Sequence, residues 1–95
     1  MDRATELERR LVTALEAEHV EVQDDSALHR GHAGARGGAG HYSVIVVAQK
    51  LEGLDRVARH RAVYEAAGDM IPSQIHALSV RAYTPEEWQE VPARS

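Results

Sequence analysis

Two of the six histidines in this 95-residue chain occupy positions where an imidazole could bind a metal ion. His32 falls in a glycine-rich stretch, and His76 lies at the start of an apolar segment, Ile75-His76-Ala77-Leu78. Neutral imidazole is the commonest metal ligand that proteins use. Because two histidines leave a coordination shell half empty, the other ligands of such a site must come from a cofactor, solvent or a second protein.

The chain contains no cysteine, so any metal site that it forms is built from nitrogen and oxygen ligands. Without cysteine there are no disulfides, and the fold does not depend on an oxidising compartment. The first residues show no apolar signal segment, and no apolar run approaches the length of a membrane span. These features predict a cytoplasmic protein with no membrane partner.

Four arginines could form a binding surface. Arg56, Arg59 and Arg61 fall on one predicted helix, and we expect Arg81 nearby. They are either a solvated helix flank, paired with acidic neighbours, or a docking face, since arginine recognises both carboxylate and phosphate. The net charge of −4 disfavours general nucleic-acid binding, although a local basic patch could override it.

Catalytic chemistry is not indicated. The serines have no nucleophile elbow or triad context, and the acidic residues are scattered along predicted helix surfaces. We therefore predict that the protein is not an enzyme.

The segments that must position these residues follow from hydrophobic periodicity. Leu7, Leu11, Ala14 and Leu15 have helical spacing, and the stretch from Tyr42 is rich in β-branched residues. The predicted order is a helix over 3–17, a strand at 19–23, a loop over 25–40, a strand over 42–48, a helix over 54–68, a break at 71–73, a strand over 75–83 and a short helix from 85.

Helix ends have clear signals. Asp2 or Thr5 could cap the first helix, and Gly68 could end the second. Thr84-Pro85-Glu86-Glu87 has the pattern of a capping box with proline in the first helical position, and Trp88 could then pack on the body of the domain.

Three other histidines receive structural interpretations. In the helix over 54–68, His60 shares a stripe with Val57, Val63, Tyr64 and Ala67, which predicts a core histidine. His19 and His41 are expected to be surface residues at strand ends. In the last strand, Leu78, Val80 and Ala82 should face one way, with His76 at the edge of the same side.

The length predicts one domain over residues 1–95, with an ordered core of about 3–90 and a flexible loop over 26–40. A hairpin followed by a helical crossover to a third strand gives an α+β fold, an αββαβ(α) sandwich with helices on one face of a three-stranded sheet. The crossover should be right-handed.

Several segments together resemble the BolA family, over residues 5–89. The most specific are Arg59-His60-Arg61-Ala62-Val63-Tyr64 on the helix and Ile75-His76-Ala77-Leu78 on the strand. The others are 18–22, 40–42, 51–54 and 83–88. The family's aromatic residue in the segment 51–54 is replaced here by Leu51, which should affect packing only.

The resemblance implies a class II KH-like fold with a helix-turn-helix-like element. It also implies a non-enzymatic protein that binds a monothiol glutaredoxin and shares a [2Fe-2S] cluster with it, with a thiolate from glutathione. The implied role is cluster trafficking or iron and redox regulation, and no cofactor is expected when the chain is alone. The alternative is a DNA-binding transcriptional regulator of stress response and cell morphology.

The implied cluster ligands are His76 and a histidine of the variable loop. Counting back from His41 favours His32, whereas counting forward from Ser26 favours His29. We prefer His32, with His29 as the alternative. Arg56, Arg59, Arg61 and Arg81 become the implied face for the glutaredoxin and its glutathione, or for DNA.

Overall fold

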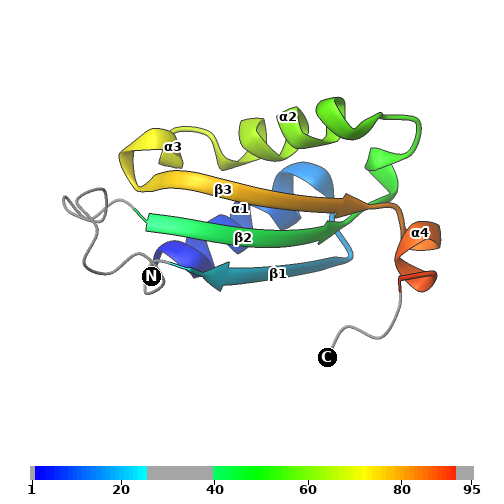
Figure 1. The fold of residues 1–95 in the computed structure, drawn as a ribbon, viewed down its shortest axis with the longest axis horizontal. Coiled ribbons are helices and arrows are strands. Elements are labelled where there is room, and N and C mark those ends of the chain that lie inside the picture. The colour runs from blue at the N-terminus through cyan, green and yellow to red at the C-terminus, as the bar shows by residue number, and fades with distance from the viewer. Residues whose placement is uncertain (1, 26–39, 92–95) are drawn as a thin grey trace.

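The computed structural model describes residues 2–25 and 40–91, which form a three-stranded sheet and the helices around it (Figure 1). Both predicted loop ligands, His29 and His32, and the predicted flexible loop except residue 40 lie outside the described residues. The elements are α1 (Arg3–Leu15), β1 (His19–Asp24), β2 (Gly40–Val47), η3 (Gln49–Leu51), α2 (Arg56–Ala67), α3 (Met70–Ser73), β3 (Ile75–Tyr83) and α4 (Pro85–Gln89).

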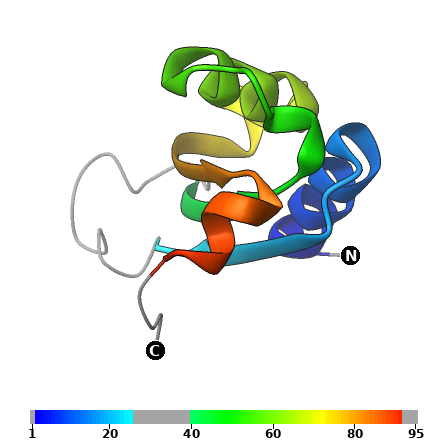
Figure 2. The same cartoon turned by 90° about the vertical axis from the view of Figure 1, so that its right-hand side faces the viewer.

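The sheet has the strand order β1-β2-β3. The hairpin strands β1 and β2 are antiparallel, whereas β2 and β3 are parallel and are joined through α2. Turning the molecule by 90° shows α1 and α2 on the same face of the sheet (Figure 2). The predicted α+β architecture is therefore confirmed.

The core lies between this face and the two long helices. Leu7 and Leu11 of α1 are fully buried, while Ala14, which was grouped with them, is exposed. Alternate residues of β2 point inward, as the period of a strand requires. Further buried core residues are Leu15, Tyr42, Val44, Val46, Leu51, Val63, Ala67, Met70, Ile75 and Leu78.

The interpretation of His60 as a core residue is wrong, because His60 is exposed and Val57 is 60% exposed. α2 is buried along Val63 and Ala67, with partly buried Ala62 beside them. The buried face of α2 is thus the side that carries its alanines rather than the side that carries Val57 and His60. The small alanine side chains let α1 and α2 pack closely. A helix with so few large apolar residues has no strong periodicity to reveal its buried side.

The helix ends follow the predicted capping residues. Asp2, rather than Thr5, caps α1 by accepting a hydrogen bond from the Thr5 backbone at 2.8 Å. Thr84 and Glu87 form the predicted capping box of α4. Gly68 ends α2 with a φ of 60°, a conformation that favours glycine.

The predicted break at 71–73 contains the one-turn helix α3, in which Ile71 has a non-helical backbone. The 3₁₀ turn η3 is not anticipated by the sequence patterns. It places Leu51 in the core, in agreement with a packing role for that position. Within the described ranges, no helix has both the length and the apolar character needed to cross a bilayer.

Candidate functional site

The first candidate site lies where β2 and β3 begin. Gly40 pairs with Ile75, but His41 pairs with Ala77, so His76 is an extra residue in β3. Such a bulge shifts the alternation of side chains. Ile75 and Leu78 are both buried although they are three positions apart, and His76 and Ala77 between them are both exposed. The bulge therefore turns the His76 imidazole out to solvent, away from the buried side on which simple alternation placed it.

A second imidazole lies next to it. The ring centres of His41 and His76 are 5.3 Å apart, with an angle of 49° between the ring planes. Two imidazoles bound through nitrogen to one tetrahedral metal ion have ring centres roughly 5 Å apart. The observed separation therefore suits two ligands of one metal ion.

Backbone hydrogen bonds fix the position of His41. The Gly40 N–H donates to the Gln74 carbonyl at 3.1 Å, and the Asp25 N–H donates to the His41 carbonyl at 2.7 Å. These bonds hold the start of β2 against both neighbouring strands. His41 is consequently placed by the sheet itself.

The site offers few ligands. Among the described residues, no group of three or more histidine, aspartate or glutamate side chains is arranged to hold a metal ion. Within the described ranges, His41 and His76 therefore offer two imidazole ligands and no third side chain to complete a site. His41 was interpreted as a surface residue, and only the register between β2 and β3 reveals its neighbour.

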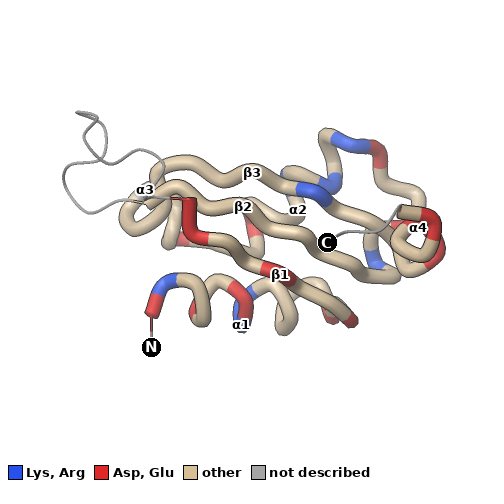
Figure 3. Tube along the Cα trace, turned by 60° about the horizontal axis from the view of Figure 1, so that its bottom comes forward, with Lys and Arg blue, Asp and Glu red and all other residues tan. Residues whose placement is uncertain are grey.

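The second candidate site is the arginine group at the start of α2 and on β3 (Figure 3). Arg59 is engaged within the protein, because its guanidinium donates to Glu87 at 2.6 and 3.1 Å. It also donates to the carbonyls of Leu54 and Ala82 at 2.9 and 3.1 Å. The Arg59 side chain is 15% exposed, so its main role in this structure is to join α2, β3 and α4.

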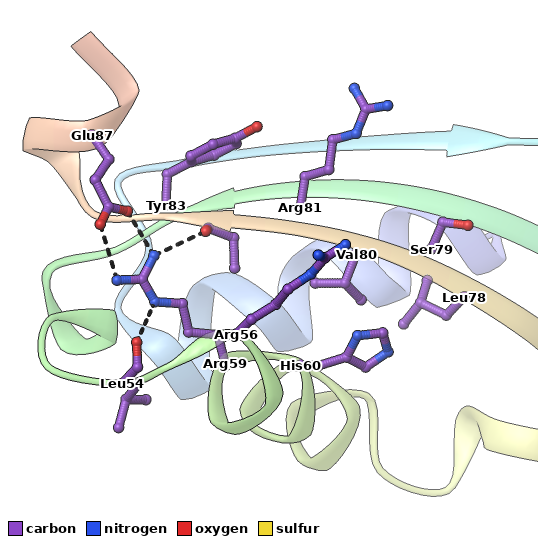
Figure 4. A pocket seen from close by; sticks show the side chains of 11 residues that line it. Leu54, Arg56, Arg59, His60, Leu78, Ser79, Val80, Arg81, Tyr83 and Glu87 are labelled. Atoms are coloured by element: carbon purple, nitrogen blue, oxygen red, sulfur yellow. Dashed lines mark hydrogen bonds and ion pairs between the residues drawn. The ribbon is translucent and has the colours of Figure 1, made fainter. Parts of the chain in front are cut away.

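The other three predicted arginines are exposed and have no carboxylate partner in the described part of the chain. Arg56 and Arg81 line the same groove between α2 and β3 (Figure 4). Arg61 lines a different depression, on α2 beside Val57. Two of the four arginines, Arg56 and Arg81, thus flank β3 from opposite sides as available cations (Figure 4).

The hydrogen bond from Arg59, together with one from the Thr84 backbone, lowers the pKa of Glu87 to about 2. This carboxylate stays charged down to strongly acidic pH and remains committed to Arg59. It therefore does not neutralise Arg56 or Arg81.

Residues 11–87 match the family model of BolA-like proteins. The chain belongs to the BolA-like family. The chain is 35% identical over 85 residues to the DNA-binding transcriptional regulator BolA of Vibrio cholerae, covering 90% of this chain and 77% of that protein. It is 37% identical over 83 residues to BolA-like protein 1 of Mus musculus, covering 87% of this chain and 58% of that protein.

A solved structure agrees with this assignment. The BolA domain of SufE1 from Arabidopsis thaliana superposes with a TM-score of 0.79 at 33% identity, covering 92% of this chain and 96% of that one. The segment matched by the BolA-like family model contains His41, His76 and all four predicted arginines. Both candidate sites therefore belong to the shared domain of the family.

Proposed function

We propose that this BolA-like chain is a non-enzymatic partner of a monothiol glutaredoxin and that the two share a glutathione-containing [2Fe-2S] cluster. Its role would be cluster trafficking or iron and redox regulation. The observation that carries the proposal is the exposed imidazole of His76, set on a bulge beside the ring of His41. Because the chain has no thiolate, the glutaredoxin and its glutathione would supply the sulfur ligands.

Imidazole ligation suits a cluster that must be transferred or sensed. Histidines in place of two cysteines on one iron raise the reduction potential of a [2Fe-2S] cluster. Imidazole also loses its ability to bind metal when it is protonated near neutral pH. The exposure of His76 leaves its ring accessible to a second protein.

The second ligand has three candidates. His32 and His29 belong to the segment 26–39, and residue 40, which follows that segment, pairs with Ile75 beside His76. His41 is the candidate within the described residues, and its ring already contacts that of His76. The resemblance to the family implies a loop histidine; we rank His32 first on the count back from His41, and treat His41 and His29 as alternatives.

The test is to mix the protein with a monothiol glutaredoxin, iron, sulfide and glutathione, and to record the visible absorption and circular dichroism spectra. We expect a cluster spectrum that differs from that of the glutaredoxin alone. The His76→Ala variant should lose this difference, as should the alanine variant at the true second ligand among His32, His29 and His41. His60→Ala is the matched control, because His60 is exposed but lies on α2.

A spectrum of the mixture that His76→Ala leaves unchanged would refute the ligand assignment. Complex formation should also be measured by size-exclusion chromatography without iron. A variant that still binds the apo-glutaredoxin but gives no mixed spectrum has lost a ligand, whereas one that fails to bind has lost the interface.

DNA binding is the second candidate function. It is favoured by the name of the Vibrio cholerae relative and by the exposed Arg56, Arg61 and Arg81. A helix-turn-helix mode finds little support, because α3 spans only four residues and contains a non-helical Ile71, too short for a recognition helix. The basic face of α2 and β3 is the better candidate surface.

Fluorescence anisotropy with promoter-length duplex DNA at several salt concentrations tests this function. Binding through phosphates should weaken steeply with salt, and each removed phosphate-binding arginine should reduce the salt slope by about 1. Arg56→Ala and Arg81→Ala are the informative variants. Binding that does not respond to salt would exclude this mode.

A further inference from the structure

A groove runs along the open edge of β3. Since β3 is an outer strand of the sheet, one of its edges has no neighbouring strand among the described residues. The groove between this edge and the first half of α2 has a volume of about 780 Å³ (Figure 4). β3 contributes the continuous stretch 78–83, and α2 contributes Arg56, Arg59 and His60.

Side chains of α2 cap two backbone carbonyls on this edge. The Tyr64 hydroxyl donates to the Leu78 carbonyl at 3.1 Å, and Arg59 donates to the Ala82 carbonyl at 3.1 Å. The Tyr83 carbonyl, in contrast, accepts from the Ala48 N–H on the β2 side. Peptide groups of successive strand residues point to opposite edges, so Leu78, Val80 and Ala82 direct theirs outward.

Val80 lies halfway between the two capped carbonyls. No side chain of the described residues donates to or accepts from its peptide groups. An edge strand with free N–H and C=O groups is a template for pairing with another extended chain. Because the Leu78 and Ala82 carbonyls already accept hydrogen bonds from α2, the part of the edge that can pair with another chain is a short segment centred on Val80.

The charges around this segment are positive. Arg56 rises from α2 into the groove, and Arg81 extends from the other side of β3 (Figure 4). Neither has a carboxylate partner in the described ranges, and Glu87, the acidic residue of the groove, is paired with Arg59. The groove therefore combines an open strand edge with two available guanidinium groups.

We propose that this groove binds an extended acidic segment of a partner protein, which adds to β3 as a fourth strand at Val80. Side chains of an added strand alternate between its two faces. One carboxylate would then face Arg56 on the α2 side, and a carboxylate on a neighbouring residue would face Arg81 on the open side of the sheet. The partner segment thus needs two adjacent acidic residues, flanked on both sides by residues that favour the extended conformation of a strand.

The geometry selects this occupant over two others. A second copy of the chain would bring an identical cationic edge, and like charges facing each other oppose pairing. A nucleic acid offers phosphates for the arginines, but it has no alternating peptide donors and acceptors for Val80. The groove is lined by residues 78–83 of β3, while His76 lies at the opposite end of that strand, so this proposal does not depend on the glutaredoxin proposal.

The experiment uses a fluorescein-labelled ten-residue peptide of valine and threonine with two adjacent glutamates at its centre, titrated with the full chain and followed by fluorescence anisotropy. We expect saturable binding, with shifts of the Val80 amide signal in ¹H–¹⁵N NMR spectra. Arg56→Glu or Arg81→Glu should weaken binding by roughly tenfold. Arg61→Glu makes the same charge change on another side of α2 and should have little effect.

The same peptide with N-methyl groups on every residue of its central segment keeps its charge but cannot pair with a strand along either of its edges, so it should not bind. The proposal would be overturned if the methylated peptide bound as tightly as the unmethylated one. It would also be overturned if Arg61→Glu weakened peptide binding as much as Arg56→Glu or Arg81→Glu does. If single-stranded DNA shifts the Val80 signal and the peptide does not, the groove is a nucleic-acid site and the proposal is wrong. Because the methylation is in the peptide, this comparison leaves the protein fold unchanged.

Discussion

The exposure of the His76 imidazole depends on one extra residue in β3. Strict alternation along the strand would place His76 on the side of Leu78 and Val80, against the helices. The shift in register between Gly40 and His41 removes that constraint, and both His76 and Ala77 are exposed. A bulge beside a functional residue is a common means of re-aiming a side chain.

At this scale we predict that the free protein binds Cu²⁺ through the pair of rings. Two imidazoles on one rigid sheet act as a chelate, so replacing either His41 or His76 by alanine should weaken Cu²⁺ binding by roughly tenfold or more. Isothermal titration calorimetry of the wild type and the two variants gives this comparison.

His60→Ala serves as the control for the Cu²⁺ experiment, because its exposed ring is on α2 and contacts Tyr64. If His41→Ala binds Cu²⁺ as the wild type does, the two rings are neighbours without being joint ligands. His76 would then keep its place in the glutaredoxin proposal, and the second ligand would be sought in residues 29 and 32.

Among the elements, α4 is the one most dependent on a few polar contacts. It has five residues, none of them buried. The capping box of Thr84 and Glu87 starts the helix, and Arg59 ties it to α2. The Trp88 ring, stacked at 5.3 Å on His19 and 5.4 Å from Tyr83, attaches it to the sheet as predicted.

The Arg59–Glu87 ion pair should make the stability depend on acid pH. The pKa of Glu87 is lowered from 4.5 to about 2, so the pair stabilises the folded state above pH 4.5, and this contribution is lost as the pH falls toward 2. Glu87→Gln keeps the capping box but removes the charge. We expect its melting temperature to be about 2–5 °C below wild type at pH 7, and the two to converge near pH 2.

Thermal unfolding followed by circular dichroism at several pH values measures this difference. Glu86→Gln, which changes a neighbouring exposed carboxylate that has no partner among the described side chains, is the matched control. If the difference in melting temperature between Glu87→Gln and wild type stays constant from pH 7 to pH 2, the glutamine side chain acts by disturbing the helix cap and not by removing the ion pair.

For the whole molecule, α1 is the largest single contributor to the core on the helical side. Leu7 and Leu11 are fully buried, and Leu15 is 8% exposed. Polar contacts orient α1 against the end of α2, where Arg10 donates to the Ala67 carbonyl at 2.8 Å and pairs with Asp69 at 2.9 Å. The helix is therefore held by packing along its length and by one arginine at the junction.

We predict that Leu11→Ala lowers the free energy of unfolding by about 2–5 kcal/mol, through lost burial and the cavity left behind. In so small a domain this is a large part of the total stability. Urea denaturation followed by circular dichroism measures the effect. Val12→Ala is the control, because Val12 is 41% exposed on the same helix and should cost much less.

The sequence by itself determined the order of the main elements, most helix ends and the family. Local signals decide these features: the capping oxygens of Asp2 and Thr84 act within three residues, and the β-branched run of β2 is contiguous. The alternation of Leu78, Val80 and Ala82 was also correct, since it follows from the period of a strand.

Only the tertiary structure decided which side chains meet. The contact of His41 with His76 depends on the register between two strands that are separated by α2. The exposure of His60 depends on which side of α2 packs against α1. The many alanines of α2 give no hydrophobic pattern from which that side could be predicted. The commitment of Arg59 to Glu87, which leaves Arg56 and Arg81 available, joins residues 28 positions apart. Such pairings come from packing between elements, and no local pattern encodes them.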